Sequence, residues 1–298
     1  MMHRFFPVGL VGLTAASLAI PRGEARAEVC DASPSGVVSV VRPAKSNGVV
    51  EIVNLDGDVK VVGWARSEVS VSGEIDPKCQ LDFSPSAERM RVRIVCPHHG
   101  QESADLEIHV PSASAVEVKS LSADASVRDV TGALRVESVS GDITIAGAPS
   151  EIAVRTTSGN VVINASTAVT RARSVSGEVH VRGVRGKASI ESVSGECTLT
   201  GGEFSDAEMR TVSGEVIFEG ALSGQGSFEF RSHSGDVLLR IPVSTSADFE
   251  LRTFSGELTT KLAAARASSG ALDFRLGNGG ARVSVRTFSG DATVEGRK

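Results

Sequence analysis

The sequence contains no tyrosine, one tryptophan and few aromatic residues overall, at 4% of 298 residues. Glycine is abundant instead, at 31 residues, and valine, serine and threonine recur in alternation. Chains of this composition favour short β-strands separated by tight turns over helix bundles. An excess of basic charge is also lacking, since the formal net charge is −5. Nucleic acid is therefore not expected as a partner, because phosphate binding needs a basic field.

A long apolar run occurs only at the N-terminus. Arg4 provides a basic start, Phe5 to Ile20 are mostly apolar, and Ala25-Arg26-Ala27 fits a small-x-small cleavage pattern. Residues 1–27 are therefore predicted to be a cleavable signal peptide rather than a membrane anchor, and the mature chain to begin at Glu28. No later run is long enough to span a membrane, so we expect a periplasmic or extracellular protein.

A Ser-Gly-acid step followed by alternating apolar residues recurs along most of the chain. One copy is Val139-Ser140-Gly141-Asp142-Ile143-Thr144-Ile145, and a degenerate copy, Ser122-Ala123-Asp124, precedes it. Successive copies lie mainly 18 to 21 residues apart, with a break at Lys261 to Gly280. Self-similarity at a fixed period of this length indicates a repeat architecture. The further copies begin at Ser158, Ser176, Ser194, Ser213, Ser234, Ser255 and Ser289.

The repeat predicts how the strands are arranged within each coil. Aliphatic pairs such as Leu134/Val136 and Ile143/Ile145 lie on either side of each Ser-Gly step. They indicate two short strands per coil with inward apolar stripes, and the Ser-Gly step forms the corner between them. Stacked coils would share one continuous core. We therefore predict an all-β, single-stranded β-solenoid of about nine coils over residues 116–298, with Val283 to Val294 as its end coil.

The region before the repeats is predicted to contain a linker at 28–47 and strands over 48–115 that cap the solenoid. A hairpin around Pro85 to Glu88 would place Phe83 opposite Val92 and Leu81 opposite Ile94. The same register places Cys79 opposite Cys96, so a disulfide is expected there in an exported protein. The pattern leaves the pairing of Cys30 open.

These motifs together resemble a known family. The early strands around Asp56-Gly57-Asp58-Val59, the Leu106-Glu107-Ile108-His109-Val110-Pro111 strand and the V-x-[ST]-x-S-G-[DE]-[VI] coils are similar to the bacterial "putative adhesin" family of unknown function. The resemblance covers roughly residues 48–296. It implies a single-stranded β-solenoid at the cell envelope and supplies no catalytic or binding residues.

Two columns of charge follow the repeat. The acids of the Ser-Gly-acid steps, such as Asp142 and Glu178, stack at one position, and arginines such as Arg155 and Arg173 form a second outward column. Calcium-binding repeats use a different spacing of Asp and Gly, so no ordered calcium is expected. Cys96, His98 and His99 lack a fourth metal ligand. We accordingly predict no catalytic, cofactor or metal residues.

The residue before each Ser-Gly step alternates with the inward positions, so it is expected to face outward. An exposed apolar column of this kind is typical of a contact surface, unless Lys261 to Gly280 or an irregular corner covers it. Its predicted members are Val139, Val175, Val193, Val212, His233, Phe254 and Phe288, with Thr157 among them.

The sequence therefore predicts an exported, non-enzymatic β-solenoid that acts as an adhesin or as a binding or structural module. Its partner would be an envelope glycan or protein that the sequence does not identify. A carbohydrate-active β-helix enzyme is one alternative, although its convergent acids would usually interrupt the repeat. A self-stacking scaffold, joined end to end, is another.

Overall fold

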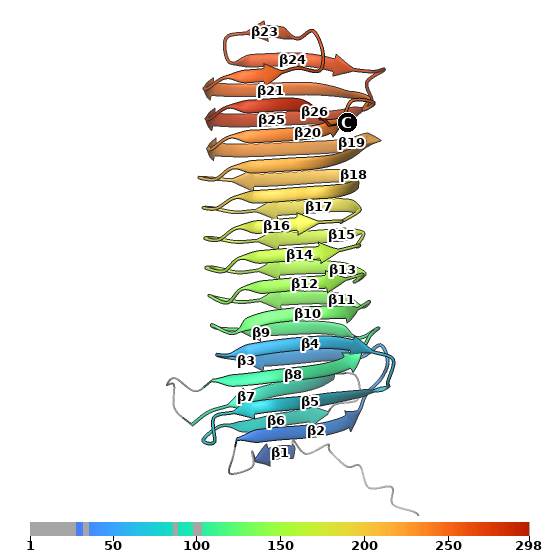
Figure 1. The fold of residues 1–298 in the computed structure, drawn as a ribbon, viewed down its shortest axis with the longest axis vertical. Coiled ribbons are helices and arrows are strands. Elements are labelled where there is room, and N and C mark those ends of the chain that lie inside the picture. The colour runs from blue at the N-terminus through green and yellow to red at the C-terminus, as the bar shows by residue number, and fades with distance from the viewer. Residues whose placement is uncertain (1–27, 32–35, 86–88, 98–102, 298) are drawn as a thin grey trace, which may run out of the picture.

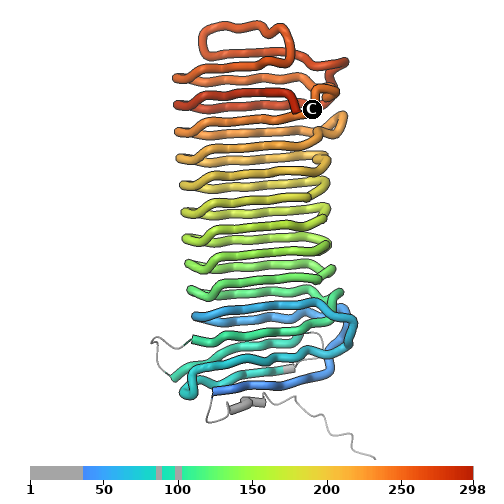
Figure 2. The backbone as a smooth tube through the Cα atoms, viewed as in Figure 1, coloured from blue at the N-terminus to red at the C-terminus, as the bar shows by residue number. Residues whose placement is uncertain are grey.

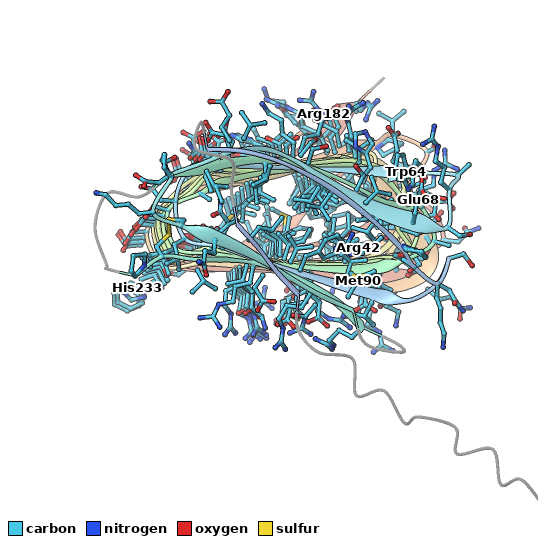
Figure 3. All side chains as sticks on the ribbon, turned by 90° about the horizontal axis from the view of Figure 1, so that it is seen from below. Arg42, Trp64, Glu68, Met90, Arg182 and His233 are labelled. Carbon is cyan, nitrogen blue, oxygen red and sulfur yellow. A yellow bond between two sulfur atoms is a disulfide. The ribbon has the colours of Figure 1, made fainter. Side chains whose placement is uncertain are left out.

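The computed structural model describes residues 28–31, 36–85, 89–97 and 103–297. Over these residues the chain forms 26 strands in one wound sheet, and no helix. The strands stack into a tall column (Figure 1), whose cross-section is flattened between two broad faces (Figure 3). The predicted signal peptide, residues 1–27, lies outside the described residues. The described residues contain no helix that is long and apolar enough to cross a membrane.

The middle of the column is a parallel β-solenoid. Leu134 pairs with Ile152, Ile152 with Thr170 and Thr170 with Ala188, each partner lying 18 residues further along the chain. Larger coils follow, in which the step becomes 19 and then 21 residues. The strands of this part are β9 (Ala115–Ser120), β10 (Asp124–Val130), β11 (Ala133–Glu137), β12 (Ile143–Gly147), β13 (Glu151–Arg155), β14 (Val161–Ala165), β15 (Val169–Arg173), β16 (Val179–Arg182), β17 (Gly186–Glu191), β18 (Cys197–Thr211), β19 (Val216–Ser234) and β20 (Val237–Pro242).

The core lies between the two faces and consists of the predicted aliphatic stripes. Ile143, Ile145, Ile152 and Ile163 are completely buried, and each coil extends the same stripes. Burying each of these side chains stabilises the fold by about 1.5–3 kcal/mol. A single coil could not bury them, because the coils above and below it cover its apolar side chains. Cys197 is buried in a stripe, and this burial raises the pKa of its thiol to about 12. It is therefore a small core residue rather than a reactive thiol.

The Ser-Gly corners stack so closely that no side chain fits at the glycine. A Cβ atom on Gly195 would lie 2.3 Å from the carbonyl oxygen of Gly177, and Gly195 has a φ of +132°. The Asp and Asn side chains beside these corners join consecutive coils. Asp124 Oδ1 accepts a hydrogen bond from the Asp142 backbone N–H at 2.8 Å, and Asp142 Oδ1 does the same for Asn160 at 2.8 Å.

The C-terminal end departs from the predicted order. Strands β25 (Ala281–Ser289) and β26 (Ala292–Arg297) do not form the end coil but lie one layer inside it. β25 pairs with β19 on one side and with β21 (Ala247–Ser255) on the other, and β26 lies between β20 and β22 (Leu258–Thr260). Figure 2 shows the last segment below the loops at the top of the column.

The Lys261 to Gly280 segment closes this end of the column. It contains β24 (Ala271–Leu276), which pairs antiparallel with β21, and β23 (Arg266–Ser268), which pairs antiparallel with β24. Phe274 stacks on Phe249 at 4.5 Å between ring centres, so the cap contributes to the core. β23 is short and exposed, which limits further strand addition at this edge.

The N-terminal end is built in the same way. The coil of β3 (Val49–Asn54) and β4 (Asp58–Trp64) lies between the later β7–β8 pair and the β9–β10 coil. Antiparallel strands then close the end, with β2 on β5, β5 on β8, β6 on β7 and β1 on β6. The bounds are β1 (Glu28–Asp31), β2 (Val37–Pro43), β5 (Glu68–Ile75), β6 (Gln80–Pro85), β7 (Arg89–Val95) and β8 (Ala104–Pro111).

The prediction of a linker over residues 28–47 is wrong, because this segment contains the paired strands β1 and β2. β2 belongs to the cap because its Val38 is buried and its whole length bonds to β5. β1 likewise pairs with β6. Proline and serine suggested a linker, but the alternation of Val38 and Val40 was the better guide to strand structure.

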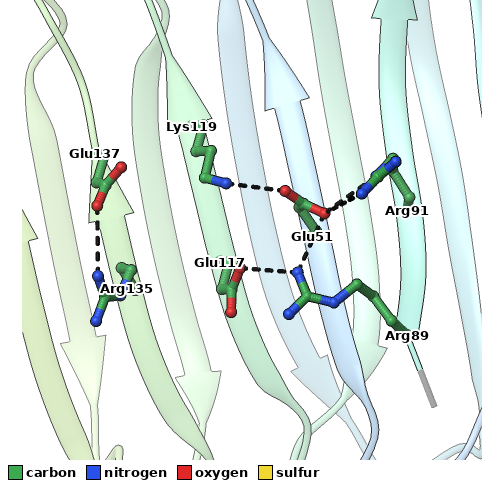
Figure 4. Close-up of polar contacts among 7 residues, drawn as sticks. All are labelled: Glu51, Arg89, Arg91, Glu117, Lys119, Arg135 and Glu137. Carbon is green, nitrogen blue, oxygen red and sulfur yellow. Dashed lines mark hydrogen bonds and ion pairs between the residues drawn. The ribbon is translucent and has the colours of Figure 1, made fainter.

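A buried ionic cluster joins the β3–β4 coil to its neighbours. Glu51 is 6% exposed and accepts hydrogen bonds from Lys119 at 2.9 Å, Arg91 at 3.1 Å and Arg89 at 3.2 Å (Figure 4). The hydrogen bond from Lys119 is the main cause that lowers the pKa of Glu51 to about 2, with Arg91 and Arg89 adding to it against the raising effect of burial. These cations come from β7 and β9, on opposite sides of Glu51.

The hairpin of β6 and β7 has the predicted register, with Phe83 opposite Val92 and Leu81 opposite Ile94. Cys79 and Cys96 continue that register and are joined as a disulfide, with a Cα–Cα distance of 4.2 Å.

Replacing both cysteines, as Cys79→Ser/Cys96→Ser, is expected to lower the free energy of unfolding by about 3 kcal/mol, because the bond closes a loop with a sequence separation of 17. Denaturant unfolding of wild type and variant measures this difference. Alkylation of the unfolded wild type without reductant should leave both thiols unlabelled. Labelling of both would contradict the disulfide.

Candidate functional site

The outward side chains at the stacked Ser-Gly corners form the candidate site, which we call the corner edge. It is one narrow end of the flattened cross-section, where His233 lies in Figure 3, opposite the end that carries Trp64. β-Strand alternation sends the buried residue of each strand end inward and its two neighbours outward. Thr156, for example, is 2% exposed, whereas Arg155 and Thr157 on either side are exposed.

The predicted apolar column is exposed along the whole edge. Val139, Val175, Val193 and Val212 are 44–47% exposed, Phe288 is 49% and Phe254 is 79% exposed. The cap at Lys261 to Gly280 closes the end of the column and leaves these residues uncovered. We call this column the ridge. In spatial order it reads Leu55, Leu121, Val139, Thr157, Val175, Val193, Val212, His233, Phe288, Phe254.

The sequence pattern did not predict two members of the ridge. Leu55 and Leu121 are 41% and 51% exposed and extend the ridge toward the N-terminal cap. Each precedes a turn, Asp56-Gly57-Asp58 and Ser122-Ala123-Asp124, as Val139 precedes its Ser-Gly step. Aligning those degenerate turns with the repeat would have identified both leucines.

The aromatic end of the ridge depends on the inserted strand. Phe288, on β25, stacks between His233 and Phe254, with 4.9 Å between ring centres on each side and interplanar angles of 10° and 4°. Both faces of the Phe288 ring are therefore covered. The three stacked rings of His233, Phe288 and Phe254, which we call the aromatic ladder, expose their edges and the outer face of Phe254. Edge-exposed rings suit apolar packing and contact with polar groups.

A groove runs beside the ridge. It has a volume of about 710 Å³ and extends over the coils from Arg155 to His233. One wall is the ridge from Thr157 to His233, and the other is the arginine column. Because the Ser and Thr residues between the walls point inward, the floor consists mainly of backbone. The groove is thus apolar on one side and basic on the other.

The arginine column is partly neutralised within the chain. Arg173 makes a two-point contact with Glu191, at 3.1 Å for each, and Arg210 lies 3.4 Å from Glu229. Arg231 also contacts Glu229. In the described part of the chain, Arg155 and Arg286 have no ion pair. One position of the column is occupied by a glutamate, Glu191. In spatial order the column reads Arg155, Arg173, Glu191, Arg210, Arg231, Arg286, Arg252.

The acidic column lies across the corner from the arginine column. Its Asp and Asn side chains are engaged by backbone N–H groups, including Asp236 with Asp291 at 2.8 Å and Asp291 with Glu257 at 2.7 Å. Glu215 makes no such bond to the next coil. Partial burial, with the charges of Glu196 and Asp236 added, raises the pKa of Glu215. Among the residues that the structure describes, no group of three His, Cys, Asp or Glu side chains could hold a metal, while His98 and His99 lie outside them.

The fold and the family can be compared with known proteins. The structure is similar to a "putative lipid binding protein" from Parabacteroides distasonis ATCC 8503, with 11% identity and a TM-score of 0.56 over 88% of this chain and 97% of that one. A "putative adhesin" from Bacteroides fragilis NCTC 9343 has 10% identity and a TM-score of 0.47, over 89% and 99% of the two chains. At these identities the first shows the fold alone, and the second is too distant to support more.

No curated protein matches the sequence. The family model described as Toastrack DUF4097 matches residues 14–186 and again 150–295, which together cover most of the chain. The chain therefore belongs to the Toastrack DUF4097 family.

Proposed function

We propose that the protein is a non-enzymatic binding module of the bacterial cell envelope that makes its contact through the corner edge. The observation that carries this proposal is the exposed ridge, which continues over ten coil positions beside a basic groove. Monomeric soluble proteins rarely expose a contiguous apolar surface of this length unless it contacts a partner. An envelope glycan or protein is the class of partner, because residues 1–27 are predicted to be a signal peptide and the coil motifs resemble the "putative adhesin" family.

The alternative of a carbohydrate-active enzyme has less support. Glycoside hydrolysis needs two carboxyl groups that face a common substrate. Here Asp124, Asp142 and Asp236 each accept a backbone hydrogen bond from the next coil, which accounts for their presence. End-to-end stacking also has less support, because antiparallel caps close both ends of the column.

The test is a binding screen of the mature chain against peptidoglycan, envelope glycans and lipid vesicles. The Val193→Ser/Val212→Ser variant removes two central ridge side chains that are already exposed, so its fold should be retained. We expect this variant to lose at least tenfold in affinity for the bound component. Val243→Ser is the matched control, since Val243 is 66% exposed away from the ridge. Equal binding by all three proteins would contradict the proposal.

Export to the envelope has its own test. Mass spectrometry of the protein recovered from the periplasm or medium of an expressing bacterium should give Glu28 as the first residue. This result follows if the signal peptide is cleaved after Ala27. An intact N-terminus beginning at Met1 or Met2, in protein confined to the cytoplasm, would rule out export.

A further inference from the structure

The corner edge is polarised across its width, and this polarity recurs from coil to coil. An arginine stands two residues before the ridge residue, and an acid stands three residues after it. The arginine and the acid therefore lie on opposite sides of the ridge. Five coils share the complete pattern, as Arg173/Glu178, Arg210/Glu215, Arg231/Asp236, Arg252/Glu257 and Arg286/Asp291.

We propose that the corner edge is a self-association surface, on which two copies of the chain pair side by side and parallel. The two-fold axis runs along the stack, and the ridge of each copy lies in the groove of the other. This inference rests on the proposed function, because it takes the same edge as the contact surface and names its partner as a second copy.

Symmetry and charge together select this arrangement. Rotation about an axis along the stack reverses the order of the columns across the edge, so that the arginines of one copy face the acids of the other. At one level, Arg210 then lies opposite Glu215 of the second copy. Rotation about an axis across the stack, which would give an antiparallel pair, preserves the order and places arginine opposite arginine. Like charges in such positions disfavour the antiparallel pair.

The groove supplies the fit for the ridge. Its arginine wall and its ridge wall leave a basic-and-apolar channel over the coils from Arg155 to His233. A ridge of valines from a second copy would meet the first ridge on one side and the stems of the arginines on the other. The acids beyond that ridge would reach the guanidinium groups, two of which, Arg155 and Arg286, have no ion pair in the described part of the chain. Pairing would also bring Arg210 to Glu215, whose pKa is raised by partial burial and by the charges of Glu196 and Asp236.

The contact has the size of an ordinary interface. At the strand spacing of about 4.8 Å, the ridge is roughly 45 Å long. With an edge roughly 15 Å wide, each copy would bury about 700 Å², close to the ~800 Å² per partner of a standard interface. The pattern is unbroken only from the coil of Arg210 onward, because Glu137 and Asp142 are both acidic in an early coil, and so are Glu191 and Glu196 in the coil just before Arg210. We therefore place the strongest contact in the C-terminal half, which also carries the aromatic ladder.

The charge pattern allows a mixing experiment by sedimentation equilibrium. Wild type is expected to be a dimer, and Arg210→Glu and Glu215→Arg alone are each expected to raise the dissociation constant at least tenfold. An equimolar mixture should recover the dimer, since Glu at 210 then faces Arg at 215. Glu215→Arg removes a like-charge contact with Glu196 and Asp236, so its melting temperature should not fall. Arg182→Glu, on a broad face away from the edge (Figure 3), should leave the dimer unchanged.

A cross-linking experiment tests the direction of the pair. In a Cys30→Ser background, Val175→Cys and Phe288→Cys should each form a disulfide-linked dimer, because parallel copies bring every ridge residue to its own counterpart. Cross-linking of only one of these variants would indicate an antiparallel pair and overturn the inference. A monomeric wild type would overturn it as well. A monomer whose ridge variants still lose envelope binding would leave the proposed function standing, whereas a monomer with unaffected binding would contradict both.

Discussion

Glu51→Gln is expected to lower the free energy of unfolding at pH 7 by about 3–5 kcal/mol, because it removes a buried carboxylate from between three cations. Lys119, Arg91 and Arg89 would then surround a neutral amide that cannot compensate their charges. The three cations belong to strands on both sides of β3, so the loss weakens the attachment of the inserted coil. Denaturant unfolding of the two proteins measures the difference.

The effect of Glu51→Gln should depend on pH. The pKa of Glu51 is lowered in the folded protein from 4.5 to about 2. The carboxylate therefore contributes stability fully above pH 4.5, and this contribution is lost as the pH falls toward 2. Wild type and variant should thus converge in stability as the pH approaches 2.

The control for this pair is Glu137→Gln. Glu137 makes a single exposed contact with Arg135 at 3.5 Å, also drawn in Figure 4. An exposed pair of this kind is worth at most about 1 kcal/mol. A cost for Glu51→Gln no larger than for Glu137→Gln would mean that the buried cluster does not stabilise the fold.

Gly195→Ala is expected to destabilise the protein by about 4 kcal/mol, the second large effect, because of two independent penalties. Its Cβ would lie 2.3 Å from the carbonyl oxygen of Gly177, which is backbone and cannot rotate away. Its φ of +132° is also a conformation that residues with a Cβ rarely adopt. Relief would require neighbouring coils to separate, which breaks the strand pairing at this corner.

Gly224→Ala provides the matched comparison. Nothing lies within 4 Å of a Cβ built on Gly224, and its φ is not in the left-handed region. The same chemical change there should alter the unfolding free energy by less than about 0.5 kcal/mol. Similar losses for both variants in thermal or denaturant unfolding would show that the stacked corner does not require glycine.

The parts that could be predicted are those in which neighbouring residues decide the structure. Alternation of apolar and polar residues predicts which side chains face inward, and it identified the ridge valines as outward-facing. The hairpin register followed from the same rule, since Phe83/Val92 and Leu81/Ile94 must share a face. The motif alone does not specify a corner, because its literal copy Ser72-Gly73-Glu74 lies within strand β5, which pairs antiparallel with β8.

The order of the coils could not be predicted in this way. Every coil presents similar backbone edges and similar apolar stripes, so the pattern does not specify which coil stacks on which. Which coil lies at each end depends instead on where the long segments near either end of the chain pair with the rest of the column. Glu51 gains its cations only because β3 lies between β7 and β9, and Phe288 reaches His233 and Phe254 only because β25 lies between β19 and β21.

The sequence by itself thus determined the all-β repeat, the inward stripes and the outward ridge, because strand alternation and the Ser-Gly corner are local properties. Only the tertiary structure decided the insertion of the first and last coils, the two antiparallel caps, and the aromatic ladder. It also decided the spatial order of the charges on the corner edge. Those features depend on pairings between strands far apart in the chain, whose free energies become distinct only when the whole column has formed.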